Sequence, residues 1–177
     1  MQKRRAFTLI ELLIVIGLIA ILAGVVFVAL DPLTRFRDAR NSRRFADVSS
    51  MLTAIRVHQV DNKGPYTASV QNMATNQYRM IGSGGVAGCT IACNATTGAD
   101  IITNVGAEVG SDDCVDLGEL ATLGYLGSVP VSQGDPPGAP TEWSSLQSGY
   151  YINKLANNAI TIGACDNEGG GGIEVIR

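Results

Sequence analysis

The chain has few of the residues that enzymes use for catalysis. Its 177 residues include one histidine, His58, and contain no HExxH pair, phosphate-binding loop or paired-carboxylate motif. These absences argue against a zinc protease, an NTPase and a Ser/His/Asp hydrolase. Residues 82–87, GSGGVA, match a dinucleotide-binding GxGxxA pattern only superficially, because no strand is predicted before them and no helix after them. We therefore expect that the chain is not an enzyme.

Charge is also scarce, at 16% of residues, and it is unevenly placed. Residues 64–177 carry three basic and eleven acidic groups, a net charge of 3 − 11 = −8, whereas residues 31–63 carry seven basic and four acidic groups. An acidic C-terminal part argues against nucleic-acid binding over its surface. The pattern indicates a basic stem followed by an acidic head.

An apolar run near the start is the strongest feature that is present. It extends from Phe7 to Leu30 behind a short basic head, Lys3 to Arg5, and contains one charge, Glu11. Leu12 to Leu30 has no charge, and as a helix it would be about 28 Å long. That length is close to the thickness of the hydrocarbon core of a bilayer, so the segment can span a membrane.

The residues around Ala6 carry a more specific signal. The run Ala6-Phe7-Thr8-Leu9-Ile10-Glu11-Leu12-Leu13 resembles the class III signal of type IV prepilins and pseudopilins. The resemblance implies that a prepilin peptidase cuts between Ala6 and Phe7 and that Phe7 becomes the N-methylated terminus. The family usually has Gly where this chain has Ala6. The resemblance also implies that the Phe7 amine of one subunit pairs with Glu11 of another, since a buried carboxylate is costly unless a cation neutralises it.

A helical stem is predicted after the membrane span. Asp31-Pro32 ends the apolar run and predicts a kink or unwinding near 27–31. From Leu33 to Asn62 one apolar stripe recurs at helical spacing, and residues 61–65, DNKGP, form a helix stop. We expect His58 to have a surface or capping role. The stripe consists of Phe45, Val48, Met51, Leu52, Ile55 and Gln59.

Five arginines at the start of this stem allow two interpretations. They could bind anionic lipid headgroups or the acidic head of a neighbouring subunit. Alternatively they form a solvated helix face with local aspartate pairing. The sequence leaves both open for Arg35, Arg37, Arg40, Arg43 and Arg44.

The head, residues 64–177, is predicted to contain a small antiparallel sheet. A short helix is expected within 112–123, with Leu117, Leu120 and Leu123 facing inward. Residues 149–155 and 159–164 predict a hairpin around Asn157-Asn158, and a last apolar stretch covers 173–176. Four segments result: a cleaved leader 1–6, a membrane and polymerisation helix 7–30, an amphipathic stem 31–63 and the head. The predicted class is α+β, a long N-terminal helix packed on a small antiparallel sheet, as in the pilin fold.

Four cysteines follow the apolar run, which indicates a disulfide framework in an oxidising compartment. Three pairings are possible, and the sequence alone does not separate them. We prefer Cys89–Cys93 with Cys114–Cys165, because the second bond would resemble the C-terminal disulfide loop of many pilins.

That second bond would bring several carboxylates together. Such a cluster repels itself unless it is protonated or bridged by a hard cation such as Ca²⁺. Calcium is a weak candidate against a solvated acidic surface, and no other cofactor is expected. The carboxylates are Asp112, Asp113, Asp116, Asp166 and Glu168.

The resemblance implies a structural subunit of a type IV pilus filament. The partners would be other copies of the chain, the prepilin peptidase, the assembly platform in the cytoplasmic membrane and, before assembly, membrane lipid. The precursor would be a single-pass protein with its N-terminus in the cytoplasm, and the assembled filament would be extracellular. Two alternatives remain: a pseudopilin of a type II secretion or DNA-uptake system, and a membrane-anchored extracytoplasmic enzyme.

Overall fold

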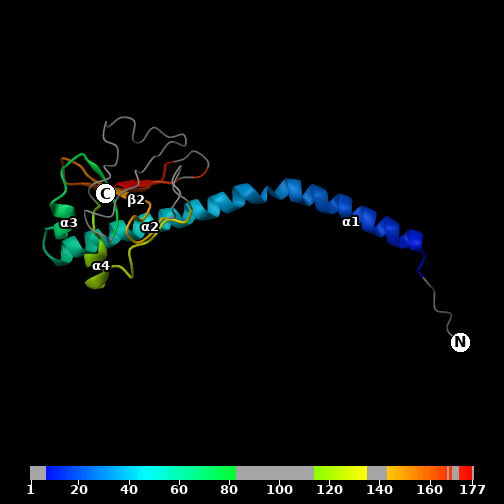
Figure 1. Cartoon of the computed structure of the whole chain (residues 1–177), viewed down its shortest axis with the longest axis horizontal. Coiled ribbons are helices and arrows are strands. Elements are labelled where there is room, and N and C mark those ends of the chain that lie inside the picture. Colours follow the sequence, from blue (N-terminus) through cyan, green and yellow to red (C-terminus); the bar gives the residue numbers. More distant parts are fainter. Residues whose placement is uncertain (1–6, 83–113, 135–142, 167, 169–171, 177) are drawn as a thin grey trace. The chain divides into compact units, whose positions relative to one another are not determined.

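The structure is a computed structural model that describes residues 7–82, 114–134, 143–166, 168 and 172–176. The chain forms two compact units, Met1–Arg37 and Asp38–Arg177. Along the described chain the elements follow the order α1, α2, α3, β1, α4, β2, β3, β4, in which α3 is the short helix Ala68–Gln71 (Figure 1).

The first unit is dominated by the apolar helix α1, Leu9–Leu30, which has 22 residues and no buried side chain. Within the described residues, one helical stretch, Leu9–Asp61, is long and apolar enough to cross a membrane. Because the apolar side chains of α1 are all exposed, lipid or other protein must cover them.

Helix α1 ends at Leu30, where the sequence predicts a break. Asp31 adopts a left-handed backbone conformation, with φ 36° and ψ 71°, and caps the helix. Helix α2, Pro32–Asp61, then begins with proline, whose missing N–H costs nothing at the first position of a helix. The Thr34 hydroxyl donates to the Asp31 carboxylate at 2.6 Å, which fixes the new helix start. The predicted interruption is confirmed.

In the second unit, α2 carries the apolar face that packs on the sheet. Its buried side chains include Val48, Met51, Leu52 and Ile55, as the periodicity predicts. Phe45 does not belong to this face, since 54% of it is exposed. The helix ends at the predicted stop, where the Gly64 N–H donates to the Gln59 carbonyl at 2.9 Å.

Two polar residues of α2 lie on the buried face instead. Arg44 is 2% exposed and His58 is 7% exposed. His58 packs edge-to-face on Tyr125 with ring centroids 5.3 Å apart, so the expected surface role is wrong. Arg44 thus occupies the face where Phe45 was expected.

Four strands form one antiparallel sheet in the order β1-β2-β3-β4. The predicted hairpin is confirmed as β2, Tyr150–Lys154, paired with β3, Ile160–Ala164. The outer strands are β1, Tyr78–Met80, and β4, Glu174–Ile176, three residues each. A long N-terminal helix followed by a small antiparallel sheet confirms the predicted α+β class.

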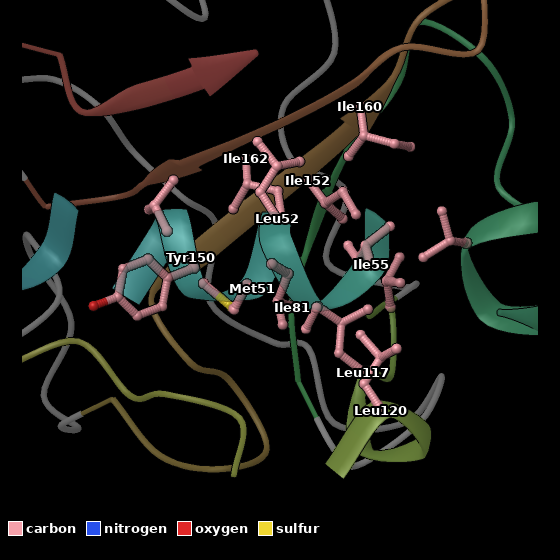
Figure 2. Close-up of a cluster of buried hydrophobic side chains, with 14 of the residues drawn as sticks. Met51, Leu52, Ile55, Ile81, Leu117, Leu120, Tyr150, Ile152, Ile160 and Ile162 are labelled. Carbon is pink, nitrogen blue, oxygen red and sulfur yellow. The ribbon is translucent and has the colours of Figure 1, made fainter. Parts of the chain in front are cut away.

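The main core lies between α2 and the sheet. Figure 2 shows Met51, Leu52 and Ile55 of α2 directed toward side chains of β2 and β3. Leu117 and, in helix α4, Gly118–Thr122, Leu120 close the core. Leu123 is 53% exposed and does not face inward as expected. Strands β2 and β3 contribute Tyr150, Ile152, Ile160 and Ile162 to this core.

A second, aromatic cluster covers the opposite face of the hairpin. Its buried members are Met80, Trp143, Tyr151 and Cys165. Tyr151 lies over its strand partner Gly163, where an added Cβ would come 2.3 Å from the tyrosine hydroxyl. Steric crowding therefore requires glycine at position 163.

Candidate functional site

The N-terminal end of α1 is the first part of the candidate site. Phe7 and Thr8 precede the helix, and Thr8 is its N-cap, with an extended backbone of φ −86° and ψ 149°. The Glu11 N–H donates to the Thr8 hydroxyl oxygen at 3.3 Å, while the Thr8 N–H donates to Glu11 Oε2 at 2.9 Å. The Thr8 hydroxyl also donates to Glu11 Oε2 at 2.7 Å. This reciprocal pair is a capping box, which satisfies donors at the start of the helix.

The capping box gives Glu11 a role that the sequence interpretation missed. Thr8-x-x-Glu11 before an apolar run is the sequence signature of this cap, so the signal was present in the chain. Both hydrogen bonds that Thr8 donates reach Oε2, and no described residue donates to Oε1. One carboxylate oxygen thus remains available for a cation from outside the chain.

The predicted cleavage point borders this cap. Ala6 lies outside the described residues, whereas Phe7 is 76% exposed and non-helical. The two residues after the predicted cut therefore precede the helix, and the helix begins at Leu9. Cleavage there would leave α1 and its cap intact. The cut itself and the pairing of the Phe7 amine with Glu11 of another chain stay predictions.

The second part of the site is the arginine-rich start of the stem. Arg40 binds Glu168 through both ends of its guanidinium, with Nε donating to Oε1 at 2.6 Å and Nη2 donating to Oε2. Buried Arg44 also reaches Glu168 Oε1, at 3.3 Å from Nη1 and Nη2. Asn41 adds a bond from its Nδ2 to the Glu168 backbone carbonyl at 2.6 Å. We call these four residues the Glu168 clamp.

The clamp also reaches the loop before the hairpin. Arg44 Nε donates to the Ser132 hydroxyl at 3.1 Å, and Nη2 donates to the Gln133 carbonyl. The hydrogen bond from Arg40, with help from Arg44, lowers the pKa of the Glu168 carboxyl below its ordinary value. The clamp fastens the C-terminal segment to the stem.

A neighbouring pair ties the sheet to the same helix. The Tyr150 hydroxyl donates to Asp47 Oδ2 at 2.8 Å. Burial, followed by the hydrogen bond to Asp47, raises the pKa of the Tyr150 hydroxyl. Tyr150 therefore stays protonated and keeps donating at physiological pH.

The structure separates the arginines that the sequence grouped together. Arg40 and Arg44 belong to the clamp, so local aspartate pairing does not account for them. Arg35, Arg37 and Arg43 are exposed, and no described residue forms an ion pair or hydrogen bond with them. These three have the freedom to meet a partner outside the chain.

The candidate calcium residues have other partners wherever the structure describes them. Asp116 accepts from the Gly118 N–H at 2.7 Å, Asp166 accepts from the Trp143 indole N–H, and Glu168 lies in the clamp. Asp112 and Asp113 fall outside the described residues. In the part of the chain that is described, no group of three or more His, Cys, Asp or Glu could hold a metal ion.

The cysteines can be placed in part. Cys165 is a buried member of the aromatic cluster, and Cys114 packs against this cluster. Cys89 and Cys93 lie outside the described residues. The connectivity stays a prediction.

Comparison with known families identifies the N-terminal segment. Residues 1–27 match the prokaryotic N-terminal methylation motif, the class III signal of type IV pilin-like proteins. No curated protein and no solved structure matches the chain. The chain therefore carries a prepilin-type N-terminus, which confirms the resemblance found from Ala6 to Leu13. Such a motif indicates processing by prepilin peptidase and a membrane-anchored precursor of the pilin or pseudopilin kind.

Proposed function

We propose that the protein is a structural subunit of a type IV pilus filament. The methylation motif at residues 1–27 is the observation that carries the proposal. The precursor is held in the cytoplasmic membrane by α1, with its N-terminus in the cytoplasm. After cleavage between Ala6 and Phe7 it is polymerised into an extracellular filament by the assembly platform. Its role is structural, not catalytic.

The exposed surface of α1 supports polymerisation through this helix. None of its 22 residues is buried within the chain. In the membrane, lipid tails cover these side chains. Once the subunit leaves the bilayer, they must be covered by protein, because exposed apolar surface of this extent drives association. Copies of the same helix supply such a cover in a filament.

Glu11 supplies the axial register of that association. Inside a helix bundle its carboxylate is costly unless a cation neutralises it. The α-amine of Phe7 in a neighbouring subunit is the cation that processing creates. Oε2 is engaged by Thr8 in the same chain, whereas Oε1 has no donor among the described residues. The two oxygens can thus serve the cap and the neighbouring subunit separately.

Two variants separate these roles. Glu11→Gln keeps a side chain that can complete a capping box but removes the charge. Thr8→Ala removes the cap and keeps the charge, at a cost of about 1 kcal/mol to the helix. Removing one partner of a buried charge pair costs about 3–5 kcal/mol, and each 1.4 kcal/mol is about tenfold. We expect Glu11→Gln to lower the filament yield at least tenfold and Thr8→Ala to lower it less.

The assay is electron microscopy and quantification of sheared surface filaments, with the processed protein in the membrane measured as a control for insertion. Filaments at the wild-type level with Glu11→Gln would contradict the register role. If deletion of the gene removes no surface filament but blocks protein secretion or DNA uptake, the pseudopilin alternative replaces the pilin proposal.

A further inference from the structure

Just beyond the membrane span, the first unit carries two exposed arginines that have no partner among the described residues. Arg35 and Arg37 lie in the first two turns of α2, within seven residues of the end of α1 at Leu30. Neither takes part in the salt bridges of the described chain, which join Arg40 and Arg44 to Glu168. Their guanidinium groups therefore face solvent.

Two large apolar side chains interleave with these arginines. Leu33 is 69% exposed and Phe36 is 63% exposed. At 100° per residue, Leu33, Phe36 and Arg37 share one side of α2, and Arg35 lies on the other. A surface that mixes exposed apolar and basic side chains is typical of the membrane–water interface. The exposure of Leu33 and Phe36 next to a membrane helix therefore indicates contact with lipid and not with water alone.

The spacing along the chain fits the depth of a lipid headgroup layer. Residues 35 and 37 follow Leu30 by five and seven positions, which is at most about 8 and 11 Å of helix. The polar region on each side of a bilayer is about 5–8 Å thick, and charges act over about 8 Å at physiological salt. Arg43 follows by thirteen positions, in the second unit, and is therefore farther along the chain from the end of the span. Headgroups surround a helix that leaves a membrane, so both sides of α2 would meet them.

The local charge favours an anionic partner. The segment 31–37 contains Asp31 and the two arginines, and the Asp31 carboxylate is already engaged by the Thr34 hydroxyl. Asp38 is exposed and follows directly, without an ion pair to either arginine. Guanidinium groups bind phosphate oxygens through two parallel hydrogen bonds.

We propose that Arg35 and Arg37 form a collar that binds the phosphates of anionic lipid headgroups where α1 emerges from the membrane. Leu33 and Phe36 pack against the glycerol and upper acyl region beside them. The collar sets the depth of the span before assembly, and its bonds to lipid must break when the subunit is extracted into a filament. This inference rests on the membrane-spanning role of α1 and not on the filament.

The test uses the full chain, one copy per lipid nanodisc, so that no second subunit is present. Phenylglyoxal modifies accessible guanidinium groups, and mass spectrometry of peptides reads the rate at each arginine. Arg43, which is exposed and like the collar residues has no partner in the described part of the chain, is the internal control. One set of nanodiscs contains phosphatidylcholine alone, and the other contains added phosphatidylglycerol.

Each arginine near an anionic surface favours the bound state by about fivefold. We therefore expect phosphatidylglycerol to slow modification of Arg35 and Arg37 about fivefold or more relative to Arg43, and high salt to reverse the effect. Arg43→Gln should leave the lipid-dependent slowing at Arg35 and Arg37 unchanged.

Equal slowing at Arg35, Arg37 and Arg43, or none, would overturn the collar. Protection that is absent in nanodiscs and present only in assembled filaments would also overturn it and would point to the acidic head of a neighbouring subunit. Failure of filament assembly leaves the nanodisc result unaffected, so the two proposals can fail independently.

Discussion

Removal of the Glu168 charge is the sharpest test of how the head is fastened to the stem. Glu168 accepts bonds from Arg40 and from Arg44, which is 2% exposed, whereas the Glu168 side chain is 26% exposed. Glu168→Gln keeps the size of the side chain and its bonding capacity but leaves buried Arg44 without an ion-pair partner among the described residues.

The magnitude follows from the surroundings of Arg44. Breaking a fully buried ion pair costs about 3–5 kcal/mol. Here the cost is smaller, because Glu168 is partly solvated and Arg44 keeps its bonds to Ser132, Gln133 and Asn41. We expect Glu168→Gln to lower the free energy of unfolding by about 2–3 kcal/mol.

Urea unfolding followed by the fluorescence of Trp143 measures this change directly. Trp143 is the single tryptophan, and it is 6% exposed within the aromatic cluster. With a urea m-value of about 2 kcal/mol/M, the midpoint should fall by about 1–1.5 M. Glu119→Gln is the matched control, since Glu119 is exposed and has no side-chain bond to a described residue. We expect it to change the free energy by less than about 0.5 kcal/mol.

The pH dependence gives an independent check with a defined sign. The pKa of Glu168 in the folded protein lies below its ordinary value of 4.5 because of the bond from Arg40. The stabilisation is therefore fully present above about pH 4.5, and it is lost as the pH falls through the folded pKa. At pH values below the folded pKa of Glu168, wild type and Glu168→Gln should therefore approach the same free energy of unfolding. A difference under 0.5 kcal/mol at neutral pH, or one that does not change with pH, would refute the ion-pair reasoning.

Two further substitutions test the packing by the same urea titration. Leu52→Ala should lower the free energy of unfolding by about 2–5 kcal/mol because Leu52 is 1% exposed, whereas Phe45→Ala should change it by less than about 1 kcal/mol. The reverse order would mean that Phe45, and not Leu52, lies in the core. Gly163→Ala should destabilise by about 1–3 kcal/mol because the new methyl group meets the Tyr151 hydroxyl. A neutral effect would show that the ring moves aside without cost.

Much of the fold could be predicted from local patterns. The apolar helix, the break at Asp31, the stop after Asp61 and the hairpin of β2 and β3 each depend on composition and turn chemistry within a few residues. Strand β1 was missed because three residues carry too little pattern, and its existence depends on pairing with β2, which is distant in sequence.

The face of α2 shows where local reasoning fails. Periodicity placed Phe45 inside and left Arg44 outside, since a charged residue is ordinarily solvated. Arg44 is buried because Glu168, 124 residues later, provides its counter-charge. No pattern within the stem contains that information. The capping box of Thr8 and Glu11, in contrast, is fully local, and the sequence contained its signature.

The most direct test of the account is mass spectrometry of the N-terminal peptide of the protein recovered from sheared surface filaments. The account predicts a peptide that begins at Phe7 and carries one added methyl group on its amine. A chain that retains Met1 and is found in the membrane but not in the filament fraction would contradict it.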